Sequence, residues 1–369
     1  MKILVTGANG FVGKNLIAEL KNRGFNDIFE FSRESDLSLL EKYTKECDFV
    51  FHLAGVNRPE DEEEFMKGNF GLTSHLLELL KKQDNKSPVL ISSSIQAEKD
   101  NPYGRSKKAG EDLLLNYYYE TDAKVYVYRL PNLFGKWSKP NYNTVVATFC
   151  HNIARDLNIQ INNPDAELNL CYIDDVLEEF LRALEGKPTM HGDFCVVPVT
   201  HNIKLGELSE LIKSFKESRT NLSIPNMENA LTKKLYSTYL SFLPEDQFSY
   251  DLKMNCDHRG SFTEFLRTPE RGQVSLNVSK PGITKGNHWH HTKNEKFLVV
   301  SGEGLIRFRK IESDEIIEYR VSGEKLQVID IPTGYTHSIV NVGEKDLVTV
   351  MWANECFNPE KPDTYFVEV

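Results

Sequence analysis

Two patterns of apolar and polar residues divide the chain. From Met1 to about Leu243, short apolar or β-branched runs alternate with amphipathic runs of helical period. The short runs predict strands at residues 2–6, 27–32, 49–53, 89–93, 125–130 and 194–199. The amphipathic runs predict helices that begin near Gly13, Glu62, Tyr103, Asn143, Asp174 and Lys204. Such alternation is typical of βαβ units in a doubly wound parallel sheet.

The pattern changes after a helical run at residues 226–243, which stops at Pro244. Beyond Tyr250 the helical period disappears, and short strands are separated by glycine turns. These strands are predicted at residues 273–278, 296–300, 304–309, 316–321, 327–331, 337–342 and 348–352. We therefore predict an α/β, Rossmann-type domain at residues 1–245 and an all-β domain at residues 246–369. Closely spaced strands of this kind favour a jelly-roll β-barrel.

Composition narrows the class of protein. A chain of 369 residues exceeds the size at which one core usually keeps growing, which agrees with two domains. The net charge of -10 disfavours nucleic acid and membrane as partners, because both reward clustered Lys and Arg. No apolar run approaches the length of about 20 residues that spans a bilayer. The six cysteines lack C-x-x-C spacing, and the first residues form a strand rather than a secretory signal. We expect a cytoplasmic protein with reduced cysteines.

A glycine-rich loop follows the first predicted strand, in the sequence Thr6-Gly-Ala-Asn-Gly-Phe-Val-Gly13. Gly7 permits a tight turn, Gly10 lets the backbone approach a pyrophosphate, and Gly13 lets the helix pack against the strand. The helix N-terminus adds N–H donors and the positive end of its dipole. We therefore expect a dinucleotide to be bound by Gly7, Asn9, Gly10, Phe11, Val12 and Gly13.

The second predicted strand ends at Phe31, beyond which an acidic residue usually binds the adenosine ribose. Ser32-Arg33 stands there instead. A guanidinium beside a hydroxyl suits a 2'-phosphate, so Ser32 and Arg33 favour NADPH over NADH. One other interpretation stays open, namely that Arg33 is a solvated loop charge, and the acidic Asp36 nearby weighs against NADPH.

Tyr103 and Lys107 lie four residues apart, which predicts that they share one face of a helix. A lysine ammonium beside a phenol lowers the pKa of the phenol, so Tyr103 is suited to exchange a proton with a carbinol or carbonyl oxygen. Lys107 can also bind the ribose of a nicotinamide nucleotide. Serines at 92–94 end the strand just upstream. One of their hydroxyls can hold a substrate carbonyl.

These motifs resemble the extended short-chain dehydrogenases/reductases, as do His52-Leu-Ala-Gly55 and Arg129-Leu-Pro-Asn-Leu-Phe-Gly135. That family reduces, oxidises or epimerises nucleotide-linked sugars. The resemblance implies that Tyr103 is the acid/base and Lys107 its helper. Ser94 would be the carbonyl-binding hydroxyl, with Ser93 as the alternative because the segment before Tyr103 is short. The further contacts that the resemblance implies are Leu53, Ala54 and Gly55 for the cofactor and Asn132 for the sugar.

A second kind of site is predicted in the all-β part, where histidines have ligand spacing. The motif is Gly282-x5-His288-x-His290-x4-Glu295-x6-Gly302, followed by Pro332-x-Gly334-x2-His337-x3-Asn341. Strand alternation sends His288 and His290 to one face while Trp289 and His291 point away. Three imidazoles and one carboxylate suit Zn, Fe, Mn, Ni or Cu. We predict one divalent metal, with Zn as the leading candidate, held by His288, His290, Glu295 and His337.

This pattern resembles a cupin, and Asp257-x-Arg-Gly-x-Phe-x-Glu264 further resembles the nucleotide-deoxyhexulose 3,5-epimerase branch of the cupins. In that branch the residue matching Arg259 grips the diphosphate, and the position of His288 carries the proton-abstracting base. An imidazole lone pair bound to a metal cannot also accept a proton, so the two resemblances conflict at His288. Phe357 stands near the place of the branch's acid tyrosine. If the metal acts as a Lewis acid on a C4 carbonyl, the candidate bases are Lys296, His291 and Tyr335.

The order of the two parts resembles bifunctional enzymes of bacterial capsular polysaccharide synthesis over essentially the whole chain. The resemblance implies a homodimer that acts on a UDP-linked 2-acetamido-2,6-dideoxy-4-hexulose. The cupin would invert C3, and the reductase would then use NADPH at C4 to give UDP-N-acetyl-6-deoxy-L-talosamine, a precursor of N-acetyl-L-fucosamine. Two alternatives stay open: a reductase whose cupin only stabilises a dimer or binds sugar, and a redox-sensing scaffold that only binds NADPH. The catalytic spacing of Tyr103 and Lys107 favours an enzyme over a sensor.

Overall fold

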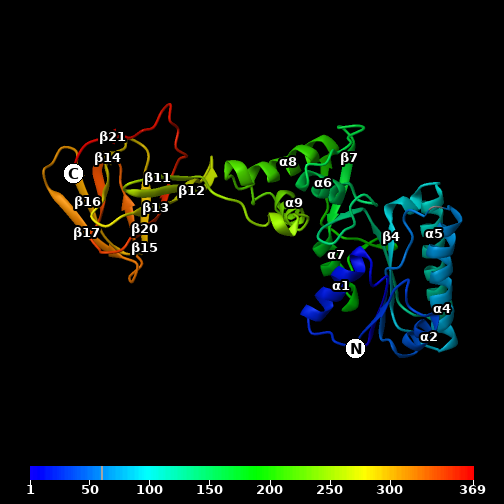
Figure 1. Cartoon of the computed structure of the whole chain (residues 1–369). Helices are drawn as coiled ribbons and strands as arrows, with labels where there is room; N and C mark the ends of the chain where they lie inside the picture. The colour runs from blue at the N-terminus through cyan, green and yellow to red at the C-terminus, as the bar shows by residue number, and fades with distance from the viewer. Residues whose placement is uncertain (60) are drawn as a thin grey trace. The chain divides into compact units, whose positions relative to one another are not determined.

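The computed structural model describes residues 1–59 and 61–369 (Figure 1). Its contacts divide the chain into two compact units. Unit 1 comprises Met1–Lys213 and Glu228–Pro244, and unit 2 comprises Ser214–Met227 and Glu245–Val369. A single division at residue 245 would place Ser214–Met227 in unit 1. The backbone N–H of Arg267, however, donates to the carbonyl of Leu222 at 2.8 Å, which ties this segment to unit 2.

A seven-stranded sheet forms the centre of unit 1. Its strands are β1 (Ile3–Thr6), β2 (Ile28–Phe31), β3 (Phe49–His52), β4 (Val89–Ser94), β5 (Val125–Leu130), β8 (Met190–His191) and β9 (Phe194–Cys195). They lie in the order β2-β1-β3-β4-β5-β9-β8, and only the β8–β9 pair is antiparallel. The chain order reverses between β1 and β3. In open parallel sheets ligands bind at the carboxyl ends of the strands around such a reversal.

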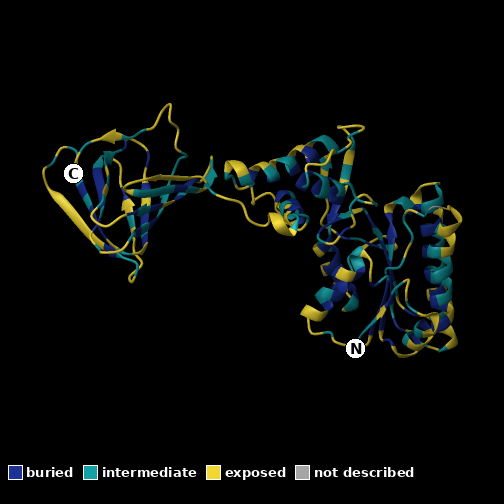
Figure 2. Cartoon of the chain, in the orientation of Figure 1, coloured by how far each residue is buried: buried dark blue, intermediate teal, exposed yellow. Residues whose placement is uncertain are grey.

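Helices cover both faces of this sheet because each has an apolar side. One face carries α1 (Phe11–Asn22) and α7 (Ile173–Leu184), and the other carries α2 (Leu37–Glu46), α4 (Leu72–Lys82) and α5 (Pro102–Thr121) (Figure 1). Leu16 and Phe180 are fully buried on the first side, and Leu76 and Leu114 on the second. The strands between the helices are accordingly dark blue in Figure 2. Shorter helical turns are α3 (Glu63–Phe65), η1 (Met66–Gly71) and η2 (Ile95–Glu98).

A smaller sheet completes unit 1. Its strands, in the order β10-β7-β6, are β10 (His201–Lys204), β7 (Glu167–Tyr172) and β6 (Asn132–Phe134). The remaining helices of the chain are α6 (Val145–Ala154), α8 (Leu205–Asn221), α9 (Ala230–Leu240) and η3 (Glu245–Gln247). The division between the two units at Lys213 therefore lies within α8.

Two antiparallel sheets form the main part of unit 2. The first is ordered β11 (Met254–Asp257), β12 (Gly260–Thr268), β13 (Gly272–Ser279), β20 (Leu347–Ala353), β15 (Glu295–Ser301) and β18 (Val328–Ile331). The second is ordered β17 (Ile316–Ser322), β16 (Glu303–Lys310), β19 (Tyr335–Asn341), β14 (Thr284–Trp289) and β21 (Tyr365–Phe366). Phe297, Ile306, Ile331 and Leu347 form part of the apolar core of this unit.

The polarity of β13 is reversed relative to an ordinary half-buried strand. Gln273, Ser275 and Asn277 are buried on its inner side, whereas Leu276 on the other side is exposed. Buried polar side chains require partners, and Gln273 donates to the Ser275 hydroxyl at 2.9 Å. The interior of unit 2 beside β13 is therefore polar.

The predicted fold class is confirmed, since a doubly wound parallel sheet precedes a β domain built from antiparallel sheets. The strand predicted at residues 194–199 is shorter, since β9 comprises only Phe194–Cys195. The strand β14 was not predicted, because its sequence Thr-Lys-Gly-Asn-His-Trp lacks apolar alternation. Within the described ranges, no helix combines the length and apolar character that crossing a membrane requires.

Candidate active site and metal centre

The glycine loop after β1 is packed too closely for larger residues. Gly7 has a φ of 70°, and a Cβ on it would lie 2.7 Å from the backbone nitrogen of Ala54. A Cβ on Gly13 would lie 2.3 Å from the Gly7 carbonyl oxygen. Because α1 begins immediately after Gly10, the N–H groups of its first turn have no helical partners and remain available to an anion.

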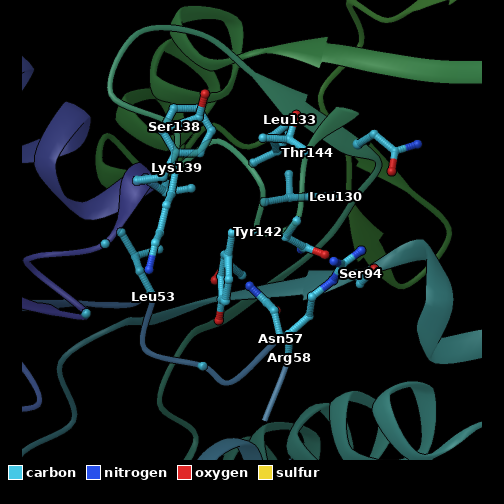
Figure 3. A pocket seen from close by; sticks show the side chains of 18 of the residues that line it. Leu53, Asn57, Arg58, Ser94, Leu130, Leu133, Ser138, Lys139, Tyr142 and Thr144 are labelled. Atoms are coloured by element: carbon cyan, nitrogen blue, oxygen red, sulfur yellow. The ribbon is translucent and has the colours of Figure 1, made fainter. Parts of the chain in front are cut away.

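A pocket of about 1030 Å³ adjoins this loop (Figure 3). Its other walls come from the carboxyl ends of β3 and β4, from α5 and from residues 130–144. The predicted site residues that line it are Gly7, Asn9, Gly10, Phe11, Val12, Gly13, Leu53, Gly55, Ser94, Tyr103, Lys107 and Asn132. Three predicted cofactor contacts, Ser32, Arg33 and Ala54, are not part of this lining.

Tyr103 and Lys107 lie in the first turns of α5, and the local sequence explains why the helix begins there. The Asn101 side chain caps it by accepting the Gly104 N–H at 2.8 Å, and Pro102 takes the first helical position. Lys107 Nζ lies 6.0 Å from the centre of the Tyr103 ring. The structure therefore brings the phenol and the ammonium to one face of α5.

Burial dominates the electrostatics of this pair. It raises the pKa of Tyr103, and a hydrogen bond with Ser94 opposes it. Burial also lowers the pKa of Lys107 to about 8, against the charge of Glu111. The expected lowering of the Tyr103 pKa by the lysine is therefore not the dominant effect. Lys107 Nζ donates to the carbonyl of Ser92 at 3.0 Å. Desolvation of the phenolate changes the Tyr103 pKa more than the charge of Lys107 does.

The two candidate serines at the end of β4 have different partners. Ser93 donates to Glu111 Oε1 at 2.6 Å, and that buried carboxylate is also bound by the Arg129 guanidinium at 2.9 and 2.7 Å. Ser94 accepts from the Gln96 N–H at 3.2 Å and hydrogen-bonds with the Tyr103 phenol. Only Ser94 therefore presents its hydroxyl next to Tyr103.

The charged side chains in the pocket lining are all cationic, although the chain is acidic overall. They are Lys14, Arg58, Lys99, Lys107 and Lys139, and no Asp or Glu among the described residues joins them. Figure 3 shows Arg58 and Lys139 projecting from loops around the pocket. The motifs did not reveal Arg58, Lys99 or Lys139, because each lies in a loop without a characteristic spacing. A pocket of this charge suits ligands with more than one phosphate.

The turn after β2 contains a carboxylate that the sequence motifs did not reveal. Glu34 Oε2 accepts from the Ser32 hydroxyl at 2.7 Å and from Asn9 Nδ2 at 3.1 Å. These hydrogen bonds, that of Ser32 foremost, lower the pKa of Glu34. Asp36 instead caps α2 by accepting the Ser38 N–H at 2.8 Å. Glu34, rather than Asp36, is thus the acidic group next to the glycine loop.

The four predicted metal ligands converge in unit 2. One ligand atom from each of His288, His290, Glu295 and His337 lies within 4.8 Å of the others. His288 comes from β14 and His290 follows that strand, Glu295 begins β15, and His337 lies opposite His288 in β19. Glu295 Oε2 is 3.6 Å from His290 Nε2 and 3.4 Å from His337 Nε2. Trp289 points away and packs on His291, as strand alternation predicts.

The donor set fits a cation. His290 Nε2, Glu295 Oε2 and both ring nitrogens of His337 are buried without a hydrogen-bond partner. Buried polar atoms are rarely left without one, so several such atoms facing one point fit the binding of a positive ion. Burial lowers the pKa of His288 to about 4, which keeps the imidazole neutral and able to bind a metal. The residues present are those that Zn commonly takes.

A cavity of about 380 Å³ lies beside Glu295. Its other ionisable lining residues are Glu264, Lys293 and Glu355, and Phe357 also lines it. The three bases considered from sequence lie elsewhere. Lys296 pairs with Asp330, His291 stacks edge-on against Tyr365, and Tyr335 packs against the apolar core.

Arg259 is tied to its neighbour in the turn between β11 and β12. Its Nε and Nη2 donate to Asp257 Oδ2 at 2.9 and 2.6 Å, and its backbone N–H donates to Asp257 Oδ1 at 2.8 Å. The guanidinium is half exposed. The guanidinium is therefore accessible, but to bind an anion it would have to release the Asp257 carboxylate.

Both parts of the chain match known protein families. Residues 3–194 match the NAD dependent epimerase/dehydratase family, and residues 255–365 match a polysaccharide biosynthesis C-terminal domain. The chain is 50% identical over 369 residues to a UDP-2-acetamido-2,6-beta-L-arabino-hexul-4-ose reductase of Pseudomonas aeruginosa, covering 100% of this chain and 99% of that one.

Solved structures give the same picture. The crystal structure of the capsular polysaccharide assembling protein CapF from Staphylococcus aureus is 57% identical, covers 100% of both chains and superposes with a TM-score of 0.96. A CapF structure with the inhibitor 3-isopropenyl-tropolone is 52% identical, with full coverage of both chains and a TM-score of 0.91. The chain therefore belongs to the NAD dependent epimerase/dehydratase family and, over its full length, to the CapF family of capsular polysaccharide assembling proteins.

Proposed function

We propose that the chain is a two-site enzyme of capsular sugar synthesis. Unit 2 inverts C3 of a UDP-2-acetamido-2,6-dideoxy-4-hexulose, and unit 1 reduces the C4 ketone with NADPH to UDP-N-acetyl-6-deoxy-L-talosamine. The observation that carries this proposal is the meeting of Tyr103, Lys107 and Ser94 in one pocket with the glycine loop. The Pseudomonas aeruginosa relative, whose name describes reduction of such a ketone, supports the choice of substrate.

In the reductase pocket the nicotinamide nucleotide supplies the hydride that reaches C4. Tyr103 supplies the proton to the C4 oxygen, and Ser94 donates a hydrogen bond to that oxygen. Lys107 holds the nicotinamide ribose. A half-buried phenol with a raised pKa stays protonated at neutral pH, which suits the direction of reduction.

The cationic lining supports two diphosphate ligands in this pocket. The glycine loop would hold the pyrophosphate of the cofactor, which leaves Arg58, Lys99 and Lys139 for the UDP diphosphate and Asn132 for the sugar. At the adenosine end, a 2'-phosphate would bind Arg33 and displace Glu34 from the Ser32 hydroxyl. NADH would leave the Glu34 contact in place, so the choice of cofactor depends on these three residues.

In unit 2 a 4-keto group acidifies the proton at C3, and a divalent cation at the histidine cluster would supply Lewis-acid chemistry. The proton acceptor is Glu264, Lys293 or Glu355, the ionisable groups that line the cavity beside Glu295, and return of a proton to the opposite face of C3 completes the inversion. Arg259 would bind the UDP diphosphate after exchanging Asp257. Both halves of the reaction require the same ketone, which is why one chain can use both sites.

The test is incubation of the full chain with the UDP-4-keto sugar in deuterated water, with and without NADPH, followed by NMR of the product. We expect deuterium at C3 without NADPH and a reduced, C3-deuterated sugar with it. His290→Ala should abolish deuterium uptake, whereas Tyr118→Phe, on the exposed side of α5, should change neither step. No uptake by the metal-loaded wild type would refute the epimerase half.

A second candidate function is a reductase whose unit 2 is only a metal-stabilised binding module. It is favoured by Phe357, which stands near the place of an acid tyrosine, and by the Arg259–Asp257 pair. This alternative predicts that metal-stripped protein reduces the ketone without inversion at C3. The same NMR experiment separates the two functions, because only the first introduces solvent deuterium.

A further inference from the structure

The C-terminal segment of the chain runs along the strands that carry the metal ligands. In β21, Phe366 pairs with His288 and Tyr365 pairs with Trp289. The N–H of Val367 donates to the carbonyl of Asn287 at 3.0 Å. The hydroxyl of Thr336, next to the ligand His337, donates to the Val367 carbonyl. The last residues of the chain therefore form part of the wall around the ligands.

Asp363 makes the densest set of contacts between this segment and the loop after His290. Its Oδ1 accepts the backbone N–H of His291 at 3.0 Å. Its Oδ2 accepts the backbone N–H groups of Thr292 and Lys293, each at 2.9 Å, and the Thr292 hydroxyl at 3.1 Å. One carboxylate thus fixes three successive residues of the loop that joins His290 to Glu295.

The backbone of Asp363 contacts a metal ligand directly. Its carbonyl oxygen lies 2.5 Å from His290 Nδ1. A carbonyl oxygen can only accept, so Nδ1 must carry the hydrogen and Nε2 must carry the lone pair. His290 Nε2 is the nitrogen that faces Glu295 Oε2 and lacks a partner. The contact with Asp363 therefore selects the tautomer that can bind a cation.

The conformation of Asp363 shows that this arrangement is held against a local preference. Its φ is 38°, on the left-handed side that L residues other than Asn and Asp rarely occupy. The unusual backbone turns the carbonyl toward His290 while the side chain reaches back to residues 291–293. Contacts at both ends of one residue maintain this conformation.

We propose that Asp363 is a positioning residue for the metal site, and that ordering of the C-terminal segment and metal binding are thermodynamically coupled. This inference rests on the metal site of the proposed function. The side chain holds the loop, the carbonyl orients His290, and the ion completes the set by occupying Nε2. Coupling is reciprocal, so a metal ion that prefers the ordered segment must also stabilise it.

The first test measures Zn²⁺ affinity of the full chain by competition with a chromophoric chelator. Asp363→Asn keeps the shape and tolerates the left-handed conformation but replaces one acceptor oxygen by a donor. We expect it to bind Zn²⁺ about 10–100-fold more weakly than wild type, the usual range for a lost outer contact to a ligand. Asp363→Gly, which removes the whole carboxylate but suits the backbone, should lose at least as much.

The matched control is Asp346→Asn, which removes the same charge from the same unit. Asp346 accepts from Lys280 at 2.8 Å on the surface, and within the described part of the chain it makes no hydrogen bond or ion pair with the four ligands. Its Zn²⁺ affinity should equal that of wild type. Affinity of Asp363→Asn within threefold of this control would overturn the inference while leaving the metal site intact. A wild-type chain that binds no Zn²⁺ would overturn the metal site and this inference together.

The second test uses the wild-type chain, so it does not depend on a variant that folds. Hydrogen exchange is followed by mass spectrometry with Zn²⁺ and after its removal by a chelator. Amides of residues 291–293, which donate to Asp363, and of residues 365–367 should exchange about tenfold or more slowly with Zn²⁺. Amides of β17 should be unaffected, because β17 pairs with β16 and not with the strands that carry the histidine ligands or with the C-terminal segment. Equal exchange of residues 291–293 in both states would refute the coupling.

Discussion

Replacing Lys107 by methionine should stabilise unit 1 and remove the reductase activity together. Lys107 is buried, and its pKa falls from 10.5 to about 8 because the ammonium is desolvated. This difference corresponds to about 3 kcal/mol of free energy by which folding disfavours the charged form. Methionine keeps most of the side-chain length without the charge, but it loses the hydrogen bond to the Ser92 carbonyl, worth about 1 kcal/mol. The net gain expected near neutral pH is about 2 kcal/mol.

The pH dependence follows from the direction of the pKa change. Below about pH 8 Lys107 is protonated in both the folded and the unfolded chain, so the full cost of burial is present. Between about pH 8 and 10.5 the unfolded chain still holds a proton that the folded chain has released. The free energy of unfolding of the wild type therefore rises with pH in this window. The advantage of Lys107→Met should shrink across the same window.

The measurement is urea unfolding of the full chain. Hydrogen exchange of peptides from α5 reports the unfolding, so that unit 1 is observed separately from unit 2. Lys108→Met is the matched control, because the neighbouring Lys108 is only half-buried, pairs with Asp112 at 2.6 Å and lies 3.9 Å from Glu111 Oε2. Its effect should stay within about 0.5 kcal/mol. The reasoning is wrong if Lys107→Met is no more stable than Lys108→Met near neutral pH. It is also wrong if the difference between them is unchanged near pH 9.5.

Other expectations concern the catalytic residue, the cofactor, the metal and the ion pair behind the site. Tyr103→Phe should lower NADPH oxidation by about 100-fold or more while deuterium uptake at C3 continues, and wild-type turnover would contradict its role as proton donor. Arg33→Ala should weaken NADPH binding by about 1.5–3 kcal/mol, as measured by titration, and equal losses for NADH would show that Arg33 does not select. Elemental analysis should find about one divalent ion per chain, and none in folded wild type would return the histidines to a structural role. Arg129→Met should destabilise unit 1 by about 3–5 kcal/mol in urea unfolding because the buried Glu111 carboxylate loses its guanidinium partner, and adding Glu111→Leu should recover part of that loss.

Much of the fold could be predicted from periodicity, because most elements bury one side. The strands β1 to β5 of unit 1 lie at the predicted places, whereas α2, β6, β7, β8 and β10 were not predicted. In unit 2, β15, β16 and β20 follow the predicted apolar pattern. The prediction of β14 failed because polar residues and a histidine stand where the pattern of a strand requires apolar residues. Strand β14 consists of Thr-Lys-Gly-Asn-His-Trp, and its place in the sheet depends on pairing with β19 rather than on its own pattern.

The same distinction applies to the site. Tyr103 and Lys107 could be predicted to share a face, since helical spacing fixes it. Residues whose role depends on distant contacts could not be found this way. Glu34 matters because Asn9 and Ser32 both reach it, and Asp363 meets a loop that lies about seventy positions earlier in the chain. Neither carboxylate has a local spacing that distinguishes it from the other acidic residues of the chain.

The polarity of β13 is the strongest physical argument that unit 2 does more than bind a stabilising ion. A structural metal requires only its four ligands, and an apolar interior around them would stabilise the barrel most. Instead Gln273, Ser275 and Asn277 are buried there, and Gln273 and Ser275 line the cavity beside the ligand Glu295. Burying such groups contributes less to stability than apolar packing. Proteins retain such departures from an apolar interior mainly at functional sites, and this one is therefore expected to bind a polar ligand.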